Sequence, residues 1–292
     1  MRRSSAGKIA RPSGRGVLVI AIIFLVAGAA YVGLKLTPHP VSPPAPPGLS
    51  FGVPDRPLRF VCFDVAHAQR GFDAVAAELK KLDGDFVLLQ EVEEDHVALL
   101  ASDLGVTGTY HPANYQRSSN IAGRKASWGN VILSKHPLYD ARPIPNPGGG
   151  IFGVWAVAVV DGRKFNVASV NLSAATDAEP THARNAAEAR HRELSNLGAA
   201  WERAGKPPMV VGGNFHEAAE GPIYSVMNNI GMDALAALGR TDDTYQSGLV
   251  NSRIDYILAS PDWRLLDGGV VRDSAASEHH PIWITARSAT QP

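Results

Sequence analysis

Three kinds of hydrophobic pattern follow one another along the chain. Residues 16–34 form an unbroken apolar run without a charged side chain. From about residue 57 onward, short apolar runs of strand length alternate with helical patterns, and at 72–82 five apolar residues share one helical face. We predict strands at 58–65, 86–92, 130–135, 151–160, 164–172, 207–215 and 252–260, and helices at 72–82 and 182–204. This alternation predicts an α/β domain.

The order of the predicted strands indicates a mixed sheet. Asp161 and Gly162 stand between two strand patterns and are typical of a tight hairpin turn, which joins antiparallel neighbours. This hairpin and the sequential order of the strands imply a mixed sheet rather than an all-parallel one. Residues 145–150 (PNPGGG) predict a surface loop inside the domain.

The apolar run near the N-terminus predicts a membrane segment. Nineteen uncharged residues as a helix would be about 28 Å long, close to the hydrocarbon thickness of a bilayer. Five basic residues precede the run and only Lys35 follows it closely. The positive-inside rule therefore predicts a basic cytoplasmic tail over 1–15 and a transmembrane signal anchor over 16–36. The C-terminal domain is then expected outside the cytoplasm.

Two other interpretations of this run stay open. Ala27, Gly28 and Ala29 resemble a signal-peptide cleavage site, so the domain could instead be secreted after cleavage. A buried core helix is the third interpretation, and the missing polar face disfavours it. After the run, the proline-rich segment 37–56 predicts a semi-rigid linker, and 57–292 predicts one large domain.

Charge is divided unevenly between the two parts of the chain. The 28 basic and 28 acidic residues balance overall, but six basic and no acidic residues lie in 1–50, which leaves an acidic domain. An acidic domain disfavours nucleic acid as a partner, although Arg117, Arg124 and Lys125 could form a local basic patch. A single cysteine, Cys62, excludes an intramolecular disulfide framework and predicts a small buried apolar side chain.

Polar residues capable of catalysis follow the predicted strands. Side chains at strand ends and in the loops after them often form the active sites of α/β proteins. The candidates are Asp64, Glu91, Asn171, Asn214, His216, Asp255, Glu278 and His279. Four other histidines match no such position and are interpreted as structural: His67, His111, His136 and His191.

Five segments resemble, in order, motifs of the endonuclease/exonuclease/phosphatase superfamily, which includes DNase I. They are GDFVLLQEVEEDH (84–96), GNVILSKHPL (129–138), VVGGNFHE (210–217), SRIDYIL (252–258) and SEHHP (277–281). The resemblance implies a four-layer α/β/β/α sandwich of two mixed β-sheets, here preceded by one transmembrane helix. It also implies hydrolysis of a phosphoester with a divalent metal, Mg²⁺ or Mn²⁺.

The same resemblance implies roles for particular residues. Glu91 stands where the family has its principal metal ligand, and Glu278 stands where a second acidic residue, an aspartate, is found. His279 matches the histidine that faces the phosphate, and Asp255 matches the carboxylate that orients it and keeps it charged.

Four positions depart from the family pattern. Asp64 stands where the family has a metal-site asparagine, and Asn171 replaces a histidine that contacts the phosphate. Asn214 replaces the aspartate that activates water, and His216 replaces an asparagine. A carboxamide cannot accept a proton as a carboxylate does. The number of acids and imidazoles is nevertheless preserved, and His216 could serve as a substitute base or metal ligand.

The sequence is therefore compatible with three functions. The favoured prediction is a membrane-anchored, metal-dependent phosphoester hydrolase, of phosphodiesterase type, with a remodelled active site. The alternatives are a catalytically silent relative that binds a phosphorylated ligand or a protein, and a purely structural domain. The class of phosphoester stays unknown, because the loops that select it carry no motif.

Overall fold

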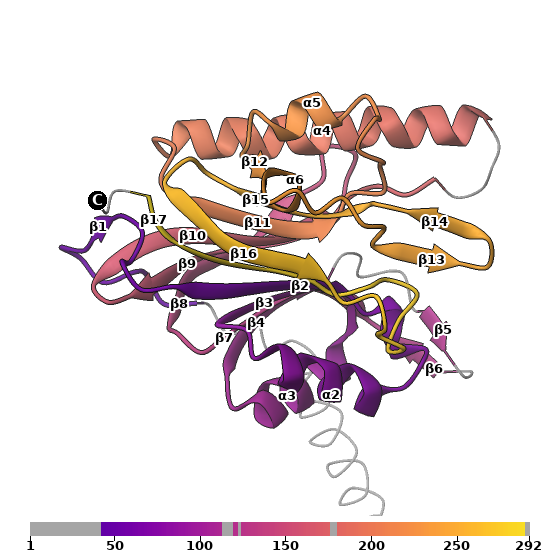
Figure 1. The fold of residues 1–292 in the computed structure, drawn as a ribbon, viewed down its shortest axis with the longest axis horizontal. Coiled ribbons are helices and arrows are strands. Elements are labelled where there is room, and N and C mark those ends of the chain that lie inside the picture. The colour runs from indigo at the N-terminus through magenta and orange to yellow at the C-terminus, as the bar shows by residue number, and fades with distance from the viewer. Residues whose placement is uncertain (1–41, 113–118, 122–123, 176–179, 290–292) are drawn as a thin grey trace, which may run out of the picture. The chain divides into compact units, whose positions relative to one another are not determined.

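The computed structural model describes residues 42–112, 119–121, 124–175 and 180–289. Within these residues, two large mixed β-sheets lie face to face, and helices cover the outer face of each sheet (Figure 1). The predicted α/β sandwich of two mixed sheets is therefore confirmed. The predicted transmembrane segment 16–36 and tail 1–15 lie outside the described residues. Over the part of the chain that the structure does describe, no helix has the length and apolarity needed to cross a bilayer.

The first sheet, called the β2 sheet, has a parallel pair of strands at its centre. Its spatial order is β16 (Trp263–Val270), β17 (Ile282–Ser288), β2 (Leu58–Asp64), β3 (Phe86–Glu93), β7 (Trp128–Ser134) and β4 (Thr107–Pro112). Strands β2 and β3 are parallel, and the other neighbours are antiparallel. The helix predicted at 72–82 forms as α2 (Phe72–Leu82) and connects β2 to β3.

The second sheet, called the β10 sheet, repeats this arrangement. Its spatial order is β12 (Met232–Asp233), β15 (Asp255–Ala259), β11 (Met209–Asn214), β10 (Arg163–Asn171), β9 (Ile151–Val160) and β8 (Leu138–Pro145), and β1 (Ser50–Phe51) pairs with one end of β10. Strands β10 and β11 are parallel, and α4 (Pro180–Arg203) connects them. Each sheet thus has two adjacent strands whose carboxyl ends lie side by side.

The remaining elements are short, apart from one further helix. Helix α3 (Glu94–Leu104) follows β3 and lies beside α2 on the outer face of the β2 sheet (Figure 1). The others are η1 (Ala66–Ala68), α5 (Tyr224–Met227), α6 (Ala234–Ala237) and the two-stranded pairs β5 (Ser119–Ile121) with β6 (Arg124–Ala126) and β13 (Tyr245–Ser247) with β14 (Val250–Ser252).

Three apolar clusters hold the layers together. One lies between the sheets and contains the rings of Phe60, Phe86, Phe165 and Trp263, whose neighbouring centroids are 5.0–6.3 Å apart. A second joins α4 to the β10 sheet, and a third joins α2 and α3 to the β2 sheet. The four rings stand several residues before the carboxyl ends of their strands, so the aromatic part of the core supports the far end of the sandwich.

The sheets approach closely near the carboxyl ends of β2 and β11. A Cβ atom on Gly212 would lie 2.7 Å from Leu88 Cδ1 and 3.1 Å from Cys62 Cβ, so any side chain there would push the sheets apart. Cys62 is fully buried at this point, as predicted. Because the sheets are close, polar residues one or two positions further along can meet across them.

The domain begins earlier than the sequence pattern predicts. Residues 42–56 were expected to belong to a linker, but they lie against the sandwich. The backbone of Ala45 donates to Asp140 Oδ2, Asp140 N donates to Pro43 O, and Ser50 and Phe51 form β1. Val53 is buried in the core between the sheets. Proline-rich backbone can therefore pack as an outer strap without forming a regular element.

Candidate active site

The candidate residues come from both sheets and gather where the parallel strands end. Asp64 is the last residue of β2, and Asn171 and Asn214 are the last residues of β10 and β11. In the β10 sheet, Asn214 is paired with Asn171 on one side and with Asp255 on the other. The topology therefore sets three candidates side by side in one sheet, facing Asp64 in the other.

The first contact across the sheets joins Asp64 to Asn214. Asn214 Nδ2 donates to Asp64 Oδ2 at 2.9 Å, and both side chains are essentially buried. The other carboxylate oxygen of Asp64 accepts from the backbone of Ala66 at 3.0 Å. These are the positions at which the sequence exchanges the family's asparagine and aspartate. The exchange therefore takes place within a single hydrogen-bonded pair.

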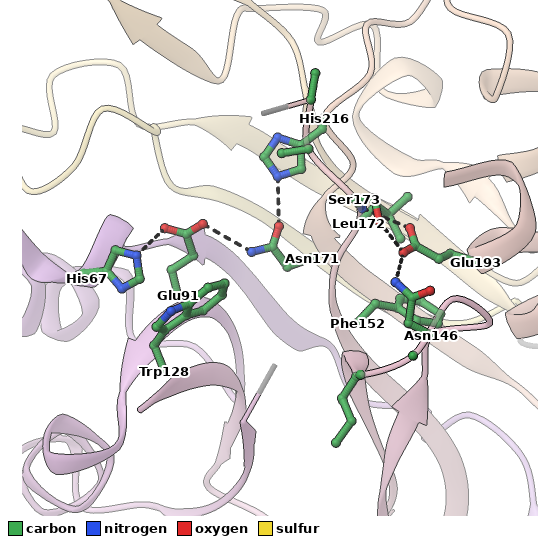
Figure 2. A pocket seen from close by; sticks show the side chains of 15 residues that line it. His67, Glu91, Trp128, Asn146, Phe152, Asn171, Leu172, Ser173, Glu193 and His216 are labelled. Atoms are coloured by element: carbon green, nitrogen blue, oxygen red, sulfur yellow. Dashed lines mark hydrogen bonds and ion pairs between the residues drawn. The ribbon is translucent and has the colours of Figure 1, made fainter. Parts of the chain in front are cut away.

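The second exchanged pair is also in direct contact. His216 Nε2 and Asn171 Oδ1 are 3.0 Å apart, and Asn171 Nδ2 donates to Glu91 Oε1 at 3.4 Å (Figure 2). The amide of Asn171 thus bridges the two sheets, with its oxygen toward the imidazole and its nitrogen toward the carboxylate. For the oxygen to accept, the imidazole must carry its proton on Nε2.

Glu91 reaches this bridge because its strand is interrupted. The pairing of β3 with β7 shifts register between Leu89 and Val92, and Glu91 itself has a φ of +54°. A left-handed residue in such a bulge turns its side chain away from the regular alternation of the strand. The bulge points the carboxylate toward the end of the sandwich rather than into the apolar layer beneath α2.

His279 and Asp255 form a buried ion pair. His279 Nδ1 lies 2.9 Å from Asp255 Oδ2, which also accepts from the Thr244 hydroxyl at 2.7 Å. On the other edge of the ring, Nε2 is 3.9 Å from Asp64 Oδ2. Thr244 was not among the sequence candidates, yet its hydroxyl also accepts from the backbone of Asp255 and so fixes this carboxylate.

Accumulated negative charge controls protonation in the site. Burial and the Asp64 carboxylate raise the pKa of Glu91 to about 8. Burial lowers the pKa of His279, but the carboxylates of Asp255 and Asp64 outweigh it and raise that pKa to about 10. Burial lowers the pKa of His216 to about 4. At neutral pH the site therefore holds one imidazolium, on His279, and two neutral imidazoles, on His216 and on His67, whose pKa burial also lowers. It also holds the carboxyl group of Glu91, whose ionisation a nearby cation would favour.

Glu278 lies apart from this group, although the motif predicted it as a second metal ligand. Its carboxylate contacts the Ser247 hydroxyl at 3.2 Å and the Tyr245 hydroxyl at 3.5 Å, and Arg70 Nη2 lies 3.8 Å away. The side chain is 45% exposed. It interacts with the β13–β14 pair, beside which this segment runs, while its neighbour His279 points into the site.

His67 also belongs to the site, although its position in the sequence predicts only a structural role. His67 Nε2 is 3.2 Å from Glu91 Oε2, and its ring packs edge-on against Trp128 with centroids 5.1 Å apart. Figure 2 shows Glu91 held between His67 and Asn171. The residue lies in η1, three positions after Asp64, and has a φ of +59°. Its place in the short connection after a strand end was the signal available in the sequence.

The donors present suit a hard divalent cation. Asp64 and Glu91 offer carboxylate oxygens, and Mg²⁺ in proteins is often bound through one or two carboxylates together with water and substrate phosphate. Burial, followed by the Asp64 carboxylate, disfavours the ionised form of Glu91 and raises its pKa to about 8, so a cation bound there would favour ionisation. Within the described residues, no three His, Cys, Asp or Glu side chains are grouped closely enough to hold a metal alone.

Comparisons with solved structures agree with the architecture. An endonuclease/exonuclease/phosphatase from Beutenbergia cavernae is 20% identical with a TM-score of 0.62, covering 80% of this chain and 72% of that one. The human nocturnin catalytic domain with bound sulfate is 16% identical with a TM-score of 0.63, covering 86% and 98%. A mannosyl-6-phosphatase from Bacteroides thetaiotaomicron is 12% identical with a TM-score of 0.62, covering 78% and 99%. At these identities the likeness shows the fold alone.

Comparison at the level of sequence identifies the family. A search of curated proteins found no match. A model of the endonuclease/exonuclease/phosphatase family, however, matches residues 62–282, from the middle of β2 to the start of β17. That range contains the strands from β3 to β16, the helices that connect them and the polar group at the strand ends. The chain therefore belongs to the endonuclease/exonuclease/phosphatase family, whose members are phosphoester hydrolases.

Proposed function

We propose that the protein is a membrane-anchored phosphoester hydrolase that works with a divalent metal, Mg²⁺ or Mn²⁺, through a remodelled active site. The observation that carries this proposal is that both departures from the family pattern are reciprocal exchanges between residues in contact. Asp64 and Asn214 are joined at 2.9 Å, and Asn171 and His216 at 3.0 Å. Each pair keeps one amide and one ionisable group.

Asp64 and Glu91 are the residues that would hold the metal. When bound, a divalent cation polarises the phosphoryl group and lowers the pKa of a coordinated water. The cation also favours the ionised form of Glu91, whose pKa burial and Asp64 raise to about 8. His67 and Asn171 fix this carboxylate from its two sides, so the ligand is oriented before any cation arrives.

His279 supplies positive charge to the reacting phosphate. Its pKa, lowered by burial but raised further by Asp255 and Asp64 to about 10, keeps the ring protonated at neutral pH. Asp255 binds Nδ1, which leaves the Nε2 edge directed toward Asp64 and the phosphate site. A cation fixed in a buried site stabilises charge that develops on phosphoryl oxygens.

Asp64 takes over the task of the carboxylate missing at position 214. It is ordered by the Asn214 amide and by the backbone N–H of Ala66, and it has lone pairs left to accept a proton from water. His216 is a weaker candidate for a general base, because burial lowers its pKa to about 4 and its Nε2 donates a hydrogen bond to Asn171 Oδ1. In this proposal His216 and Asn171 orient Glu91 and the substrate.

The location of the enzyme forms part of the proposal. The uncharged run at 16–34, preceded by five basic residues, supports a single-pass anchor with the catalytic domain outside the cytoplasm. Secretion after cleavage near Ala27–Ala29 is the alternative. Accessibility of the domain to protease in intact cells, together with the mass of the mature N-terminus, distinguishes a retained anchor from a cleaved signal.

Hydrolysis is tested with generic substrates. The full-length protein, purified in a mild detergent, is expected to release p-nitrophenol from bis-p-nitrophenyl phosphate or p-nitrophenyl phosphate with Mg²⁺ or Mn²⁺, and to stop with EDTA. Glu91→Ala and His279→Ala should each lower the rate by at least about 100-fold. Glu202→Ala and His191→Ala change exposed residues of α4 and are matched controls that should retain full activity. Equal turnover in all four variants would contradict the proposal.

A second candidate is a catalytically silent domain that binds a phosphorylated ligand or a protein partner. It is favoured by the carboxamide at position 214, which cannot accept a proton, and by the lack of a three-residue metal group among the described side chains. This candidate predicts no turnover in the wild type and new turnover in Asn214→Asp combined with His216→Asn. Metal-dependent turnover by the wild type excludes it.

A further inference from the structure

The candidate active site opens into a pocket that extends well beyond the reacting groups. The pocket has a volume of about 650 Å³, within the range of ligand sites in proteins. At one end lie Glu91, Asn171 and His216, and at the other end a second hydrogen-bonded group is formed by Asn146, Ser173 and Glu193 (Figure 2). A substrate bound through its phosphate at the first group would place its alcohol part toward the second.

The second group is built around a buried carboxylate. Glu193, on α4, has no exposed surface, and it accepts hydrogen bonds from Ser173 N at 3.0 Å and Ser173 Oγ at 2.7 Å. Asn146 Nδ2 is its third donor. All three donors are neutral, so they orient the carboxylate without cancelling its charge. Through them, α4 fixes the loop after β8 and the loop after β10 as two walls of the pocket.

The charge of the pocket is unusual for a site meant to hold several phosphates. Two carboxylates, Glu91 and Glu193, line it, and no lysine or arginine does so among the residues that the structure describes. Phosphate groups in proteins are commonly held by arginine forks or lysine ammonium groups. A second phosphate on the substrate would therefore find a carboxylate at the far end and no lysine or arginine among the described lining residues. Arg190 lies behind this wall and donates to Ser173 O at 3.0 Å, but its charge is paired with Glu217.

The rest of the lining suits an uncharged partner with hydroxyl groups. It includes the Trp128 ring, the amide of Asn146, the hydroxyl of Ser173 and the chain at Gly149 and Gly150. A cationic group such as a quaternary ammonium is usually held by several aromatic faces. Here Phe152 is only 2% exposed, which leaves Trp128 as the accessible ring among the described lining residues.

We propose that this pocket binds the alcohol part of a phosphate ester, and that the preferred alcohol is a neutral polyol such as a sugar. Esters that carry a further phosphate on the alcohol are rejected. This assignment rests on the proposed function, because that function places the phosphate group beside Glu91, Asn171 and His216. Glu193 is a positioning residue here, because it fixes the two walls of the pocket by accepting hydrogen bonds from Asn146 and Ser173. Its carboxylate also contributes negative charge to that end of the pocket.

Two probes that differ by one phosphate test the proposal. Binding of glucose 6-phosphate and glucose 1,6-bisphosphate to the full-length protein is measured by calorimetry in Mg²⁺, and phosphate release is measured separately. Glucose 6-phosphate is expected to bind about fivefold more tightly, which corresponds to the upper end of the range measured for surface charge pairs. Ala174→Lys adds a cation to the pocket and should tighten bisphosphate binding by about fivefold, with less than a twofold change for the monophosphate.

The control separates a pocket effect from a general change in charge. Ala289→Lys adds the same charge at an exposed position after β17, outside the pocket, and should leave both affinities unchanged. Bisphosphate binding equal to or tighter than monophosphate binding in the wild type would overturn the proposal, as would binding of neither probe or an unchanged ratio in Ala174→Lys. Selective binding without any phosphate release would instead refute the hydrolase function and leave the pocket assignment standing.

Discussion

Exchanging Asp64 and Asn214 tests whether the two residues act as one unit. The single variant Asn214→Asp places a second carboxylate oxygen about 2.9 Å from Asp64 Oδ2 in a buried site. Two unit charges at that distance repel by about 6 kcal/mol at an effective dielectric constant near 20. Protonating one ordinary carboxyl group at pH 7 costs about 4 kcal/mol, which is less than this repulsion. The pair is therefore expected to share a proton, and the protein should lose up to about 4 kcal/mol of stability.

The double variant Asp64→Asn/Asn214→Asp restores one carboxylate and one amide to the same hydrogen bond. Its free energy of unfolding should return to within about 1 kcal/mol of the wild type. With Asp64→Asn alone expected to change stability by less than about 1 kcal/mol, since two amides can still form one hydrogen bond, the coupling in the double-mutant cycle is about 3 kcal/mol. Unfolding in urea, followed by tryptophan fluorescence, measures the four proteins. EDTA is present, because a bound cation would mask the repulsion between the two carboxylates.

Activity provides the second half of this test. Asp64→Asn alone leaves two amides and no carboxylate in the pair, so hydrolysis of bis-p-nitrophenyl phosphate in Mn²⁺ should fall by about 100-fold or more. The double variant should regain at least part of this loss, because a carboxylate again stands in the pair. Additive losses of stability in the double variant, or full activity in Asp64→Asn, would show that the pair does not act as one unit.

Three further outcomes follow from the same geometry. Reversing the second exchange with Asn171→His/His216→Asn should change the free energy of unfolding by less than about 1 kcal/mol, whereas Asn171→His alone should lose more, since it sets two imidazoles in contact. The pKa of His279 is lowered by burial but raised by Asp255 and Asp64 from 6.5 to about 10. Its stabilisation is therefore present below about pH 6.5 and lost as pH rises toward 10, and His279→Gln should flatten the urea-unfolding profile over that range. Phe165→Ala removes a fully buried ring and should cost about 3–5 kcal/mol in urea unfolding, at the opposite end of the sandwich from the site.

The fold could largely be predicted from the sequence because its central strands are buried on both faces. Strands such as β2 and β9 are nearly continuous apolar runs, and such a run can be recognised as a strand without knowledge of the strands that pair with it. Helix α3 went unpredicted, although Val97, Leu100, Ala101 and Leu104 follow helical spacing. Only Leu100 of that helix is buried, so its pattern competes with exposed polar positions.

The candidate site was predictable in most of its members but not in its contacts, and His67 and Thr244 were missed. The strand ends and the family resemblance identified Asp64 and Asn214, yet these residues are 150 positions apart in the chain and belong to different sheets. Their hydrogen bond depends on how closely the sheets pack at Gly212, which no local pattern encodes. Glu278 shows the converse: its motif position was clear, but its carboxylate lies against Tyr245 and Ser247 of the β13–β14 pair.

The reciprocal nature of the two exchanges bears on whether the site works. A single replacement of Asp by Asn at position 214 would place two carboxamides against each other and remove a buried negative charge. The presence of aspartate at position 64 retains both the hydrogen bond and the charge, at the other end of the same contact. The imidazole that is missing at position 171 likewise reappears at its partner, 3.0 Å away. If the site needed only to fold, neutral side chains could form the same hydrogen bonds at lower electrostatic cost. Instead the site keeps buried carboxylates, and burial together with the Asp64 carboxylate raises the pKa of Glu91 to about 8. The proposed cation-dependent site gives that cost a function, and this is the physical argument for the proposed hydrolase over the silent domain.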